Sequence, residues 1–301
     1  MAGAPRETRF PDFLGIGTTR GGSSWLYRVL SRHPDVWMPP VKEVHYFDRP
    51  NDGIRTVTLA RRELLIRGRD YLIGEHKRST GDSLWQTIRW DAHYLFGPRG
   101  LDWYRSLFRP HPRQLTGEVT PAYAILDTAR IRLIDQHNPD LKAIYLLRNP
   151  IERAWSSVVN SLARKKRRSI TTVPIERVIS SAESVARQSR SDYAGNVRRW
   201  REVVGQERLF IGYMEEIRND PNELMERICR FLGISLPDQQ VRESMLERVN
   251  TTSRYGAPLP DHIRYRMAKI LLPYVEDTAA LLGGYAEQWL EQTRRILADR
   301  S

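Results

Sequence analysis

Cysteine is almost absent from this sequence: of 301 residues, only Cys229 carries a thiol. A single thiol excludes an intrachain disulfide framework and favours a reducing compartment. Long apolar runs are also missing, because no stretch approaches the ~20 apolar residues that a membrane-spanning helix needs. The N-terminal segment lacks the apolar core of a secretory signal peptide. These absences predict a cytoplasmic protein without stable membrane insertion.

Lysine is scarce as well, at six positions, so arginine supplies most of the basic charge. The 48 basic and 36 acidic residues give a formal net charge of +12. Such a surplus attracts anions, which include nucleic acid, anionic lipid and polyanionic small molecules. A nucleic-acid-binding module is one interpretation of this charge, but the sequence carries no zinc-finger or RNP signature. We therefore expect no nucleic-acid partner.

The apolar pattern predicts strands that alternate with helices. Short apolar runs predict strands at 13–17, 36–38, 115–119, 143–147 and 209–213, and helical spacing predicts helices at 23–32, after Pro150 and at 222–232. This alternation favours an α/β, P-loop-like three-layer fold with a central parallel sheet flanked by helices. We expect a single domain over residues 1–301, with a helical insertion at about 51–100 that mixes basic stretches and glycine-rich breaks.

A glycine-rich loop joins the first predicted strand to the first predicted helix. Gly17 is followed after four residues by Gly22, and Arg20 lies between them. Backbone N–H groups of such a loop and of the next helix N-terminus point at bound phosphate. The spacing resembles a nucleotide P-loop, but Ser23 stands where an NTPase carries lysine. The pattern predicts a phosphate cradle that supplies its own cation and uses no metal; a tight turn that merely contains glycines is the alternative.

A second anion site is predicted where the strand at 143–147 ends. Arg148 follows it directly, at the edge where open α/β sheets bind ligands, and no magnesium-binding Asp stands there. Ser156 lies eight residues later, about two helical turns along. A phosphate between Arg148 and Ser156 would receive charge-assisted hydrogen bonds. The alternative is that Arg148 pairs with Glu152 and that Ser156 is a small packing residue.

Several motifs resemble those of sulfotransferases that use 3′-phosphoadenosine 5′-phosphosulfate (PAPS). Residues 17–26 (GTTRGGSSWL) resemble the 5′-phosphosulfate loop, and residues 147–156 (LRNPIERAWS) resemble the 3′-phosphate motif. Residues 42–48 (KEVHYFD) and 117–123 (GEVTPAY) are similar to the base-carrying and substrate-side segments of the glycosaminoglycan (heparan sulfate) branch. With the segment 213–233, the likeness covers residues 12 to 235. On these motifs the chain is identified as a bacterial-type member of the family.

The resemblance implies a donor site made from both anion sites. The 5′-phosphosulfate would be held by Arg20, Gly21, Gly22, Ser23, Ser24 and Trp25. The 3′-phosphate of PAPS, and of the product 3′,5′-ADP, would be held by Arg148 and Ser156. A late polar loop would add Arg254, Tyr255 and Gly256.

The resemblance also implies the catalytic groups. Glu43 would be the general base of an in-line sulfuryl transfer to a hydroxyl, and Arg20 would stabilise charge on departing 3′,5′-ADP. His45 lies two residues after Glu43, so both side chains would share one side of an extended segment. His45 would then orient Glu43 or the acceptor, or be the base itself. The alternative is that Glu43 is an ordinary surface carboxylate.

Departures from the family pattern leave the acceptor open. Arg20 stands where the loop usually has lysine, Val119 stands where the branch often has lysine, and the segment between Asp48 and Gly117 is longer. We expect the hydroxyl of a glycan, a lipid or a small-molecule natural product. The basic run at 164–168 (RKKRR) is either a solvated loop or a feature that steers an anionic acceptor. The oligomeric state stays open, and a P-loop nucleotide kinase or NTPase is the alternative function.

Overall fold

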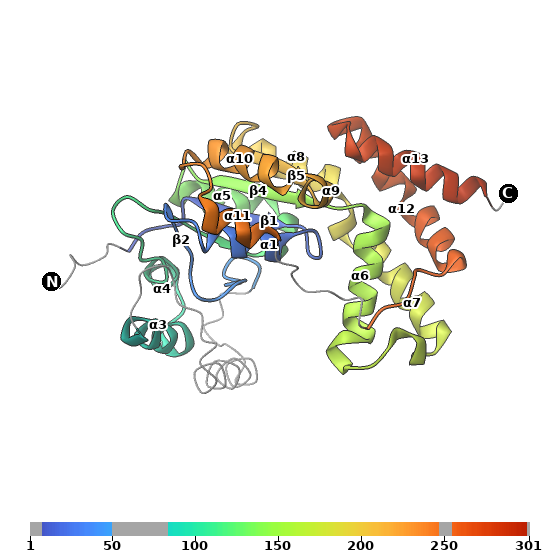
Figure 1. Ribbon diagram of the computed structural model, residues 1–301, viewed down its shortest axis with the longest axis horizontal. Helices are drawn as coiled ribbons and strands as arrows, with labels where there is room; N and C mark the ends of the chain where they lie inside the picture. Colours follow the sequence, from blue (N-terminus) through green and yellow to red (C-terminus); the bar gives the residue numbers. More distant parts are fainter. Residues whose placement is uncertain (1–7, 50–83, 247–254, 300–301) are drawn as a thin grey trace.

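The computed structural model describes residues 8–49, 84–246 and 255–299. Its centre is a five-stranded parallel sheet in the order β2-β3-β1-β4-β5 (Figure 1). The strands are β1 (Phe13–Gly17), β2 (Val36–Trp37), β3 (Leu115–Val119), β4 (Lys142–Leu147) and β5 (Leu209–Tyr213). The sequence predicted all five; β2 is one residue shorter than expected and β4 one residue longer.

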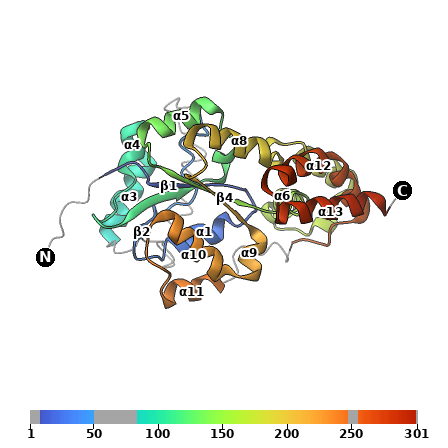
Figure 2. The same ribbon diagram turned by 90° about the horizontal axis from the view of Figure 1, so that it is seen from above.

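Side chains of the central strands alternate between two apolar clusters, because successive residues of a strand point to opposite faces. On β4, Ala143 and Tyr145 join one cluster, whereas Ile144 and Leu146 join the other. Each cluster is closed by helices on its own face of the sheet (Figure 2). The result is the three-layer α/β arrangement, and the predicted fold class is confirmed.

Three helices cover one face of the sheet: α1 (Ser23–Leu30), α10 (Pro221–Leu232) and α11 (Gln239–Leu246). The opposite face is covered by α5 (Thr128–His137) and α8 (Tyr193–Val204). A further group stands beyond the sheet at one end of the molecule (Figure 1). Its members are α6 (Pro150–Leu162), α7 (Ile175–Ala186), α12 (Asp261–Leu282) and α13 (Tyr285–Ala298).

The remaining helical segments are short, apart from α3. They are α3 (Leu84–Phe96), α4 (Leu101–Ser106), α9 (Met214–Asn219) and the 3₁₀ turns η1 (Pro121–Ile125), η2 (Arg164–Lys166), η3 (Ile170–Thr172) and η4 (Ser189–Ser191). All of α3 falls in the expected insertion; the Trp90 ring stacks on Tyr94, and Tyr94 stacks on Trp103. Residues 51–83 of that insertion lie outside the described residues.

Local hydrogen bonds fix where α1 ends and where α6 begins. α1 ends at Leu30, two residues before the predicted end, because the amide N–H groups of Arg32 and His33 bond three residues back, in tighter 3₁₀ turns ahead of Pro34. α6 begins at Pro150, as the proline predicts. The Asn149 side chain accepts from the first free amides of α6, at 3.0 and 3.3 Å. This cap fixes the turn that follows Arg148.

Candidate active site

The two predicted anion sites lie at the same edge of the sheet. β1 and β4 are parallel neighbours, with Gly17 opposite Tyr145 in the register. The loop after β1 and the residues after β4 therefore leave the sheet side by side. This is the carboxyl edge at which open α/β sheets bind ligands.

The loop after β1 is shaped by glycines. A Cβ on Gly21 would lie 2.3 Å from the Thr18 side chain, and one on Gly22 would lie 2.5 Å from Ile217. Gly22 also has φ +105°, which a residue with a side chain adopts only with strain. As the N-cap of α1, Gly22 leaves the first turn without a side-chain cap. The N–H groups at this helix start are thus arranged as in a phosphate cradle.

Arg20 joins the loop to the second predicted site. Its backbone is left-handed, with φ +68°, and its Nε donates to Ser156 Oγ at 3.0 Å. Burial, together with the nearby charges of Arg164 and Arg148, lowers the pKa of Arg20 to about 10. The guanidinium remains charged at neutral pH, among other cations. Such a cluster of positive charge favours a bound anion.

Arg148 makes the ion pair of the alternative interpretation and a second contact that neither interpretation predicted. Its Nη2 lies 2.9 Å from Glu152 Oε2, which is the ion pair of the alternative. Its Nη1 donates to the carbonyl oxygen of Arg20 at 3.1 Å, so the same guanidinium also holds the phosphate loop. Glu152 is shared, because Arg218 lies 3.2 Å from the same oxygen. Positive charge is therefore left over for an anion beside Ser156.

A buried arginine lies behind Arg148. Arg153 is fully buried, and its Nη2 donates to Ser191 Oγ at 2.7 Å, while its Nε has no hydrogen-bond partner. Burial lowers the pKa of Arg153. The hydroxyl of the neighbouring Tyr193 donates to the Arg148 carbonyl at 2.9 Å. This layer supports the turn after β4 from within the core.

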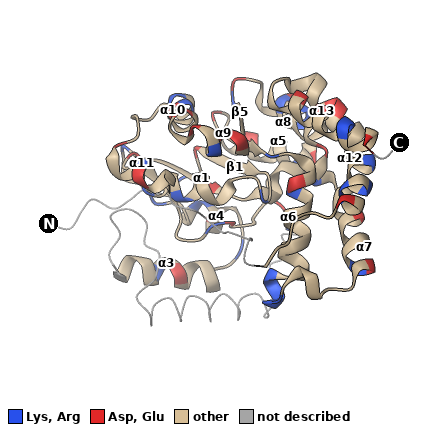
Figure 3. Ribbon diagram, turned by 45° about the vertical axis from the view of Figure 1, so that its right-hand side comes forward, with Lys and Arg blue, Asp and Glu red and all other residues tan. Residues whose placement is uncertain are grey.

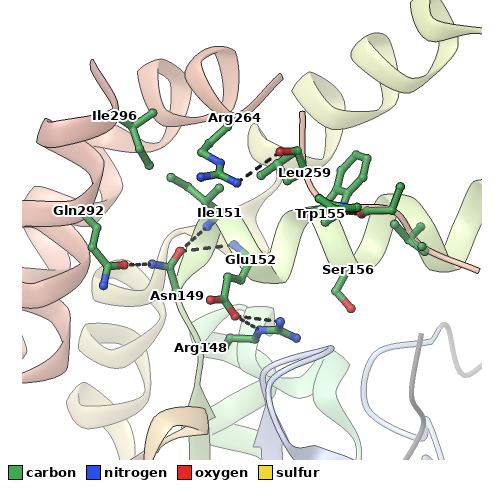
Figure 4. Close-up of a pocket in the computed structure, with 14 residues that line it drawn as sticks. Arg148, Asn149, Ile151, Glu152, Trp155, Ser156, Leu259, Arg264, Gln292 and Ile296 are labelled. Carbon is green, nitrogen blue, oxygen red and sulfur yellow. Dashed lines mark hydrogen bonds and ion pairs between the residues drawn. The ribbon is translucent and has the colours of Figure 1, made fainter. Parts of the chain in front are cut away.

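A cavity of about 610 Å³ opens beside Arg148 and Ser156 (Figure 4). Trp155 and Leu259 supply apolar wall, and Gly256 lines it from the late loop. Three of the predicted donor-site residues thus line one cavity: Arg148, Ser156 and Gly256.

Other predicted donor residues occupy different settings. Tyr255 lies beside Gly256, and its carbonyl accepts from the Ile170 amide at 3.0 Å. Trp25 is 4% exposed, and its indole donates to the Met245 carbonyl, so it packs α1 against α11. Arg254 lies outside the described residues. The binding roles assigned to these three residues stay predictions.

Glu43, His45 and Asp48 form a chain of ionic contacts. His45 Nδ1 lies 2.8 Å from Asp48 Oδ2, and its Nε2 lies 3.3 Å from Glu43 Oε2. Burial opposes protonation of His45, but the two carboxylates outweigh it and raise its pKa to about 9. Burial also opposes ionisation of Glu43, but His45 and Lys42 outweigh it and lower its pKa to about 2. At neutral pH the pair is a carboxylate beside an imidazolium.

The backbone that carries this pair differs from the expectation. The sequence argument placed both side chains on one side of an extended segment, and that premise is wrong. Glu43 has φ +68° and His45 has φ +57°, which is left-handed backbone on both sides of Val44. The side chains meet through this local turn rather than through strand alternation.

Lys42 connects Glu43 to the phosphate loop. Its Nζ donates to Glu43 Oε1 at 2.8 Å, to Ser24 Oγ at 3.1 Å and to Ser23 Oγ at 3.3 Å. Glu43 therefore lies one ammonium group away from the start of α1. The predicted base and the predicted phosphate loop are brought together.

A buried carboxylate holds the Glu43 segment in place. Glu118 on β3 has no exposed surface, and its Oε2 accepts from the Val44 amide at 3.2 Å. The hydroxyl of Tyr123 donates to Glu118 Oε1 at 3.0 Å and accepts from the Tyr46 amide at 2.9 Å. The hydroxyl of Tyr104 donates to the same Oε1 at 2.6 Å. Burial raises the pKa of Glu118, which these donors oppose.

The basic run at 164–168 lies at the end of α6, where Figure 3 shows basic residues gathered. Lys165, Lys166 and Arg167 are exposed. Arg164 is half-buried, donates to Asn160 Oδ1 at 3.2 Å and adds to the positive charge around Arg20. One end of the run therefore belongs to the surroundings of the phosphate loop, the three middle residues face solvent, and Arg168 at the other end donates to the Leu162 carbonyl at 3.1 Å.

Sequence reasoning missed three groups around the predicted base. Lys42 and Asp48 were within a recognised motif but had no role, and Glu118 was assigned only to a substrate-side segment. A signal was available for Glu118, because a carboxylate inside an otherwise apolar strand is rarely buried without partners. Lys42 offered no such signal, because its contact with the start of α1 depends on the path that the chain takes after β2.

The sulfotransferase family matches residues 11–238, which is most of the chain, and the chain belongs to that family. Human heparan sulfate glucosamine 3-O-sulfotransferase 6 is 30% identical over 165 residues, covering 54% of this chain and 34% of that protein. Mouse heparan sulfate glucosamine 3-O-sulfotransferase 5 is 22% identical over 233 residues, covering 75% of this chain and 54% of that protein. The chain thus spans between a third and about half of the length of these relatives.

A solved sulfotransferase from Alicyclobacillus acidocaldarius shares the fold. Its TM-score is 0.64 at 24% identity, and the match covers 93% of this chain and 98% of that one. The predicted family is therefore confirmed, and the alternative of a P-loop kinase or NTPase is not favoured.

Neither a membrane span nor a metal cluster occurs among the described residues. Across 8–49, 84–246 and 255–299, no helix is both long and apolar enough to cross a membrane. Within the same ranges, no cluster of three or more His, Cys, Asp or Glu is arranged to hold a metal ion.

Proposed function

We propose that this protein transfers the sulfuryl group of PAPS to a hydroxyl acceptor. One observation carries the proposal: a carboxylate, Glu43, lies beside a phosphate loop that is itself bonded to a second anion site. Arg20 links that loop to Ser156 at 3.0 Å, and Lys42 links it to Glu43 at 2.8 Å. A donor with phosphate groups at both ends requires two anion sites, and transfer to a hydroxyl requires a base.

The donor would lie along the carboxyl edge of the sheet. Its 5′-phosphosulfate would bind the amides at the start of α1, with Ser23 and Ser24. Its 3′-phosphate would bind Arg148 and Ser156, which line the same cavity as Gly256. The 3′-phosphate contacts would distinguish PAPS from nucleotides that lack this group. Arg20 lies between the two ends.

The transfer is an in-line displacement at sulfur. The acceptor oxygen forms a bond to sulfur while the bond from sulfur to the bridging oxygen of the 5′-phosphate breaks, and 3′,5′-ADP leaves with that electron pair. The proton of the acceptor hydroxyl passes to Glu43. Arg20 would offset the charge that grows on the leaving group. The protein mainly positions the reactants and stabilises charge.

The protonation states favour Glu43 over His45 as the base. His45 is held between two carboxylates, its pKa is raised to about 9, and it therefore already carries its proton at neutral pH. Glu43 is ionised at neutral pH, because its pKa is lowered to about 2, and can therefore accept a proton. His45 would orient the Glu43 carboxylate, as its 3.3 Å contact supports.

The acceptor is proposed only as a class: the hydroxyl of a glycan, a lipid or a small-molecule natural product. The exposed basic residues at the end of α6 favour an acceptor that carries negative charge. By their names, the human and mouse relatives act on glucosamine of heparan sulfate, which supports a glycan within this class.

Calorimetry and a transfer assay test the proposal. Purified protein should bind 3′,5′-ADP with and without a chelator, and more tightly than ATP with magnesium. Radiolabelled PAPS should then transfer label to members of a hydroxyl-acceptor panel. The proposed donor would be contradicted if the protein bound ATP but not 3′,5′-ADP, or if binding of 3′,5′-ADP disappeared with the chelator.

A further inference from the structure

Lys42 has an unusual set of partners. Its ammonium group has three protons, and the three acceptors are two serine hydroxyls at the start of α1 and one oxygen of Glu43. Its side chain is 21% exposed, so it is enclosed but can be reached. This ammonium therefore spans the gap between the donor loop and the base.

That gap is where the reacting group must lie. In an in-line transfer, sulfur stands between the bridging oxygen, held at the start of α1, and the acceptor oxygen, next to Glu43. The Nε of Arg20 donates to Ser156, in the second anion site. Among the described residues, Lys42 is the cation that contacts Ser23, Ser24 and Glu43 together.

The present contacts of Lys42 also restrain the base. Its ion pair with Glu43, at 2.8 Å, stabilises the carboxylate and so weakens it as a proton acceptor. An anionic group bound between the serines and Glu43 would compete for the ammonium, because charge-assisted bonds are stronger than bonds to neutral hydroxyls. Movement of Lys42 toward that anion would leave Glu43 more basic when the donor is in place.

We propose that Lys42 is a catalytic residue that binds the sulfuryl group during its transfer, and that in the free protein it holds Glu43 until the donor arrives. The inference rests on the proposed function. Lys42 forms no covalent bond in this step. The acceptor proton goes to Glu43, and 3′,5′-ADP leaves with the electron pair of the broken bond. Lys42 offsets the charge on the sulfuryl oxygens.

Two ligands that differ in one group test this role. PAPS carries the sulfuryl group and 3′,5′-ADP does not, so Lys42→Met should weaken PAPS about 10- to 100-fold, as loss of a charge-assisted bond predicts. Affinity for 3′,5′-ADP should change no more than about twofold. Dissociation constants would be measured by calorimetry without acceptor, and kcat by label transfer. Lys42→Arg, which keeps the charge, should recover part of the lost affinity for PAPS and part of any loss in kcat.

Controls separate direct contact from other effects. Lys269 is an exposed lysine on α12, so Lys269→Met removes the same charge elsewhere and should leave both affinities unchanged. Arg148→Ala should weaken both ligands, since both carry the 3′-phosphate. The double variant Lys42→Met with Glu43→Gln also removes the carboxylate that could repel the donor. The PAPS-specific loss should persist in it, because that loss comes from the missing contact with Lys42 and not from repulsion by Glu43.

The outcomes are distinguishable. Equal losses for PAPS and 3′,5′-ADP in Lys42→Met overturn the inference, as does full recovery of PAPS binding in the double variant. If Lys42→Met does not fold, Lys42→Gln takes its place, and unchanged PAPS affinity with unchanged kcat in that variant overturns the inference. Wild-type protein that binds neither ligand overturns the proposed function itself.

Discussion

Tyr123 is expected to keep the catalytic segment in position, and Tyr104 provides a matched comparison. Both hydroxyls donate to the same oxygen of Glu118, at 3.0 and 2.6 Å. Only the Tyr123 hydroxyl also accepts an amide of the segment that carries Glu43, from Tyr46 at 2.9 Å. Changing each tyrosine to phenylalanine removes one donor from a buried carboxylate, but only Tyr123→Phe releases the segment.

The free energies follow from these contacts. Loss of a hydrogen bond to a charged group costs ~1.5–3 kcal/mol, which Tyr104→Phe should show in its free energy of unfolding. Tyr123→Phe adds a buried amide without an acceptor, at ~1–3 kcal/mol more. The Tyr46 ring stacks on Tyr104 at 4.6 Å, and phenylalanine preserves that stacking. A displacement of ~1 Å at the base should lower kcat by ~100-fold in Tyr123→Phe.

Chemical denaturation would give the stabilities, and label transfer from PAPS would give kcat and KM. We expect kcat to fall in Tyr123→Phe with little change in KM for PAPS, because the donor site is formed by other residues. In Tyr104→Phe, kcat should stay within a few-fold of wild type. If kcat falls equally in both variants, Tyr123 supports only the fold, and the reasoning is refuted.

Three further predictions concern the site itself. Glu43→Gln should lower kcat by ~100-fold or more at unchanged affinity for 3′,5′-ADP, because it removes the base and keeps the shape; an acidic phenol acceptor should partly restore turnover, and no restoration would mean that Glu43 only positions the acceptor. Arg148→Ala and Ser156→Ala should each weaken 3′,5′-ADP more than 5′-AMP, by ~1.5–3 kcal/mol for the arginine, and calorimetry that finds equal losses would place the 3′-phosphate elsewhere. His45 has a pKa raised to about 9, so the stability that it contributes is fully present below its ordinary pKa of ~6.5 and is lost as pH rises through about 9. Denaturation between pH 6 and 10 should show this loss in wild type and not in His45→Gln.

The strands and the phosphate loop were predictable because their signals are local. The apolar run at 143–147 and the glycines before α1 need no knowledge of distant residues. The ion pair of Arg148 with Glu152 was foreseen as the alternative interpretation, since the two residues are only four apart in the sequence. Local sequence signals are therefore sufficient to predict which residues follow the strands at the carboxyl edge of the sheet.

What the sequence did not predict depends on distant parts of the chain meeting. Arg20 reaches Ser156 across 136 residues, through a left-handed backbone that arginine seldom adopts. The Glu118 carboxylate accepts from the Val44 amide, 74 residues earlier in the chain, and from the hydroxyls of two tyrosines. Neither contact follows from periodicity or spacing. The left-handed residues Glu43 and His45 flank Val44, whose amide is held by the distant Glu118.

The strand order divides the chemistry between two halves of the molecule. β1 lies in the middle, with the base and its supporting network on the β3–β2 side and the 3′-phosphate residues on the β4 side. Arg20 reaches from the donor loop to Ser156 on the β4 side, and Lys42 reaches to the donor loop from the segment that carries the base. We therefore expect the chain between β2 and β3 to influence acceptor preference, whereas Arg148 and Ser156, the residues predicted to bind the 3′-phosphate, lie outside it. An exchange of that segment between relatives, with Lys42 and Glu43 retained, would be expected to transfer acceptor preference and to leave recognition of the 3′-phosphate unchanged.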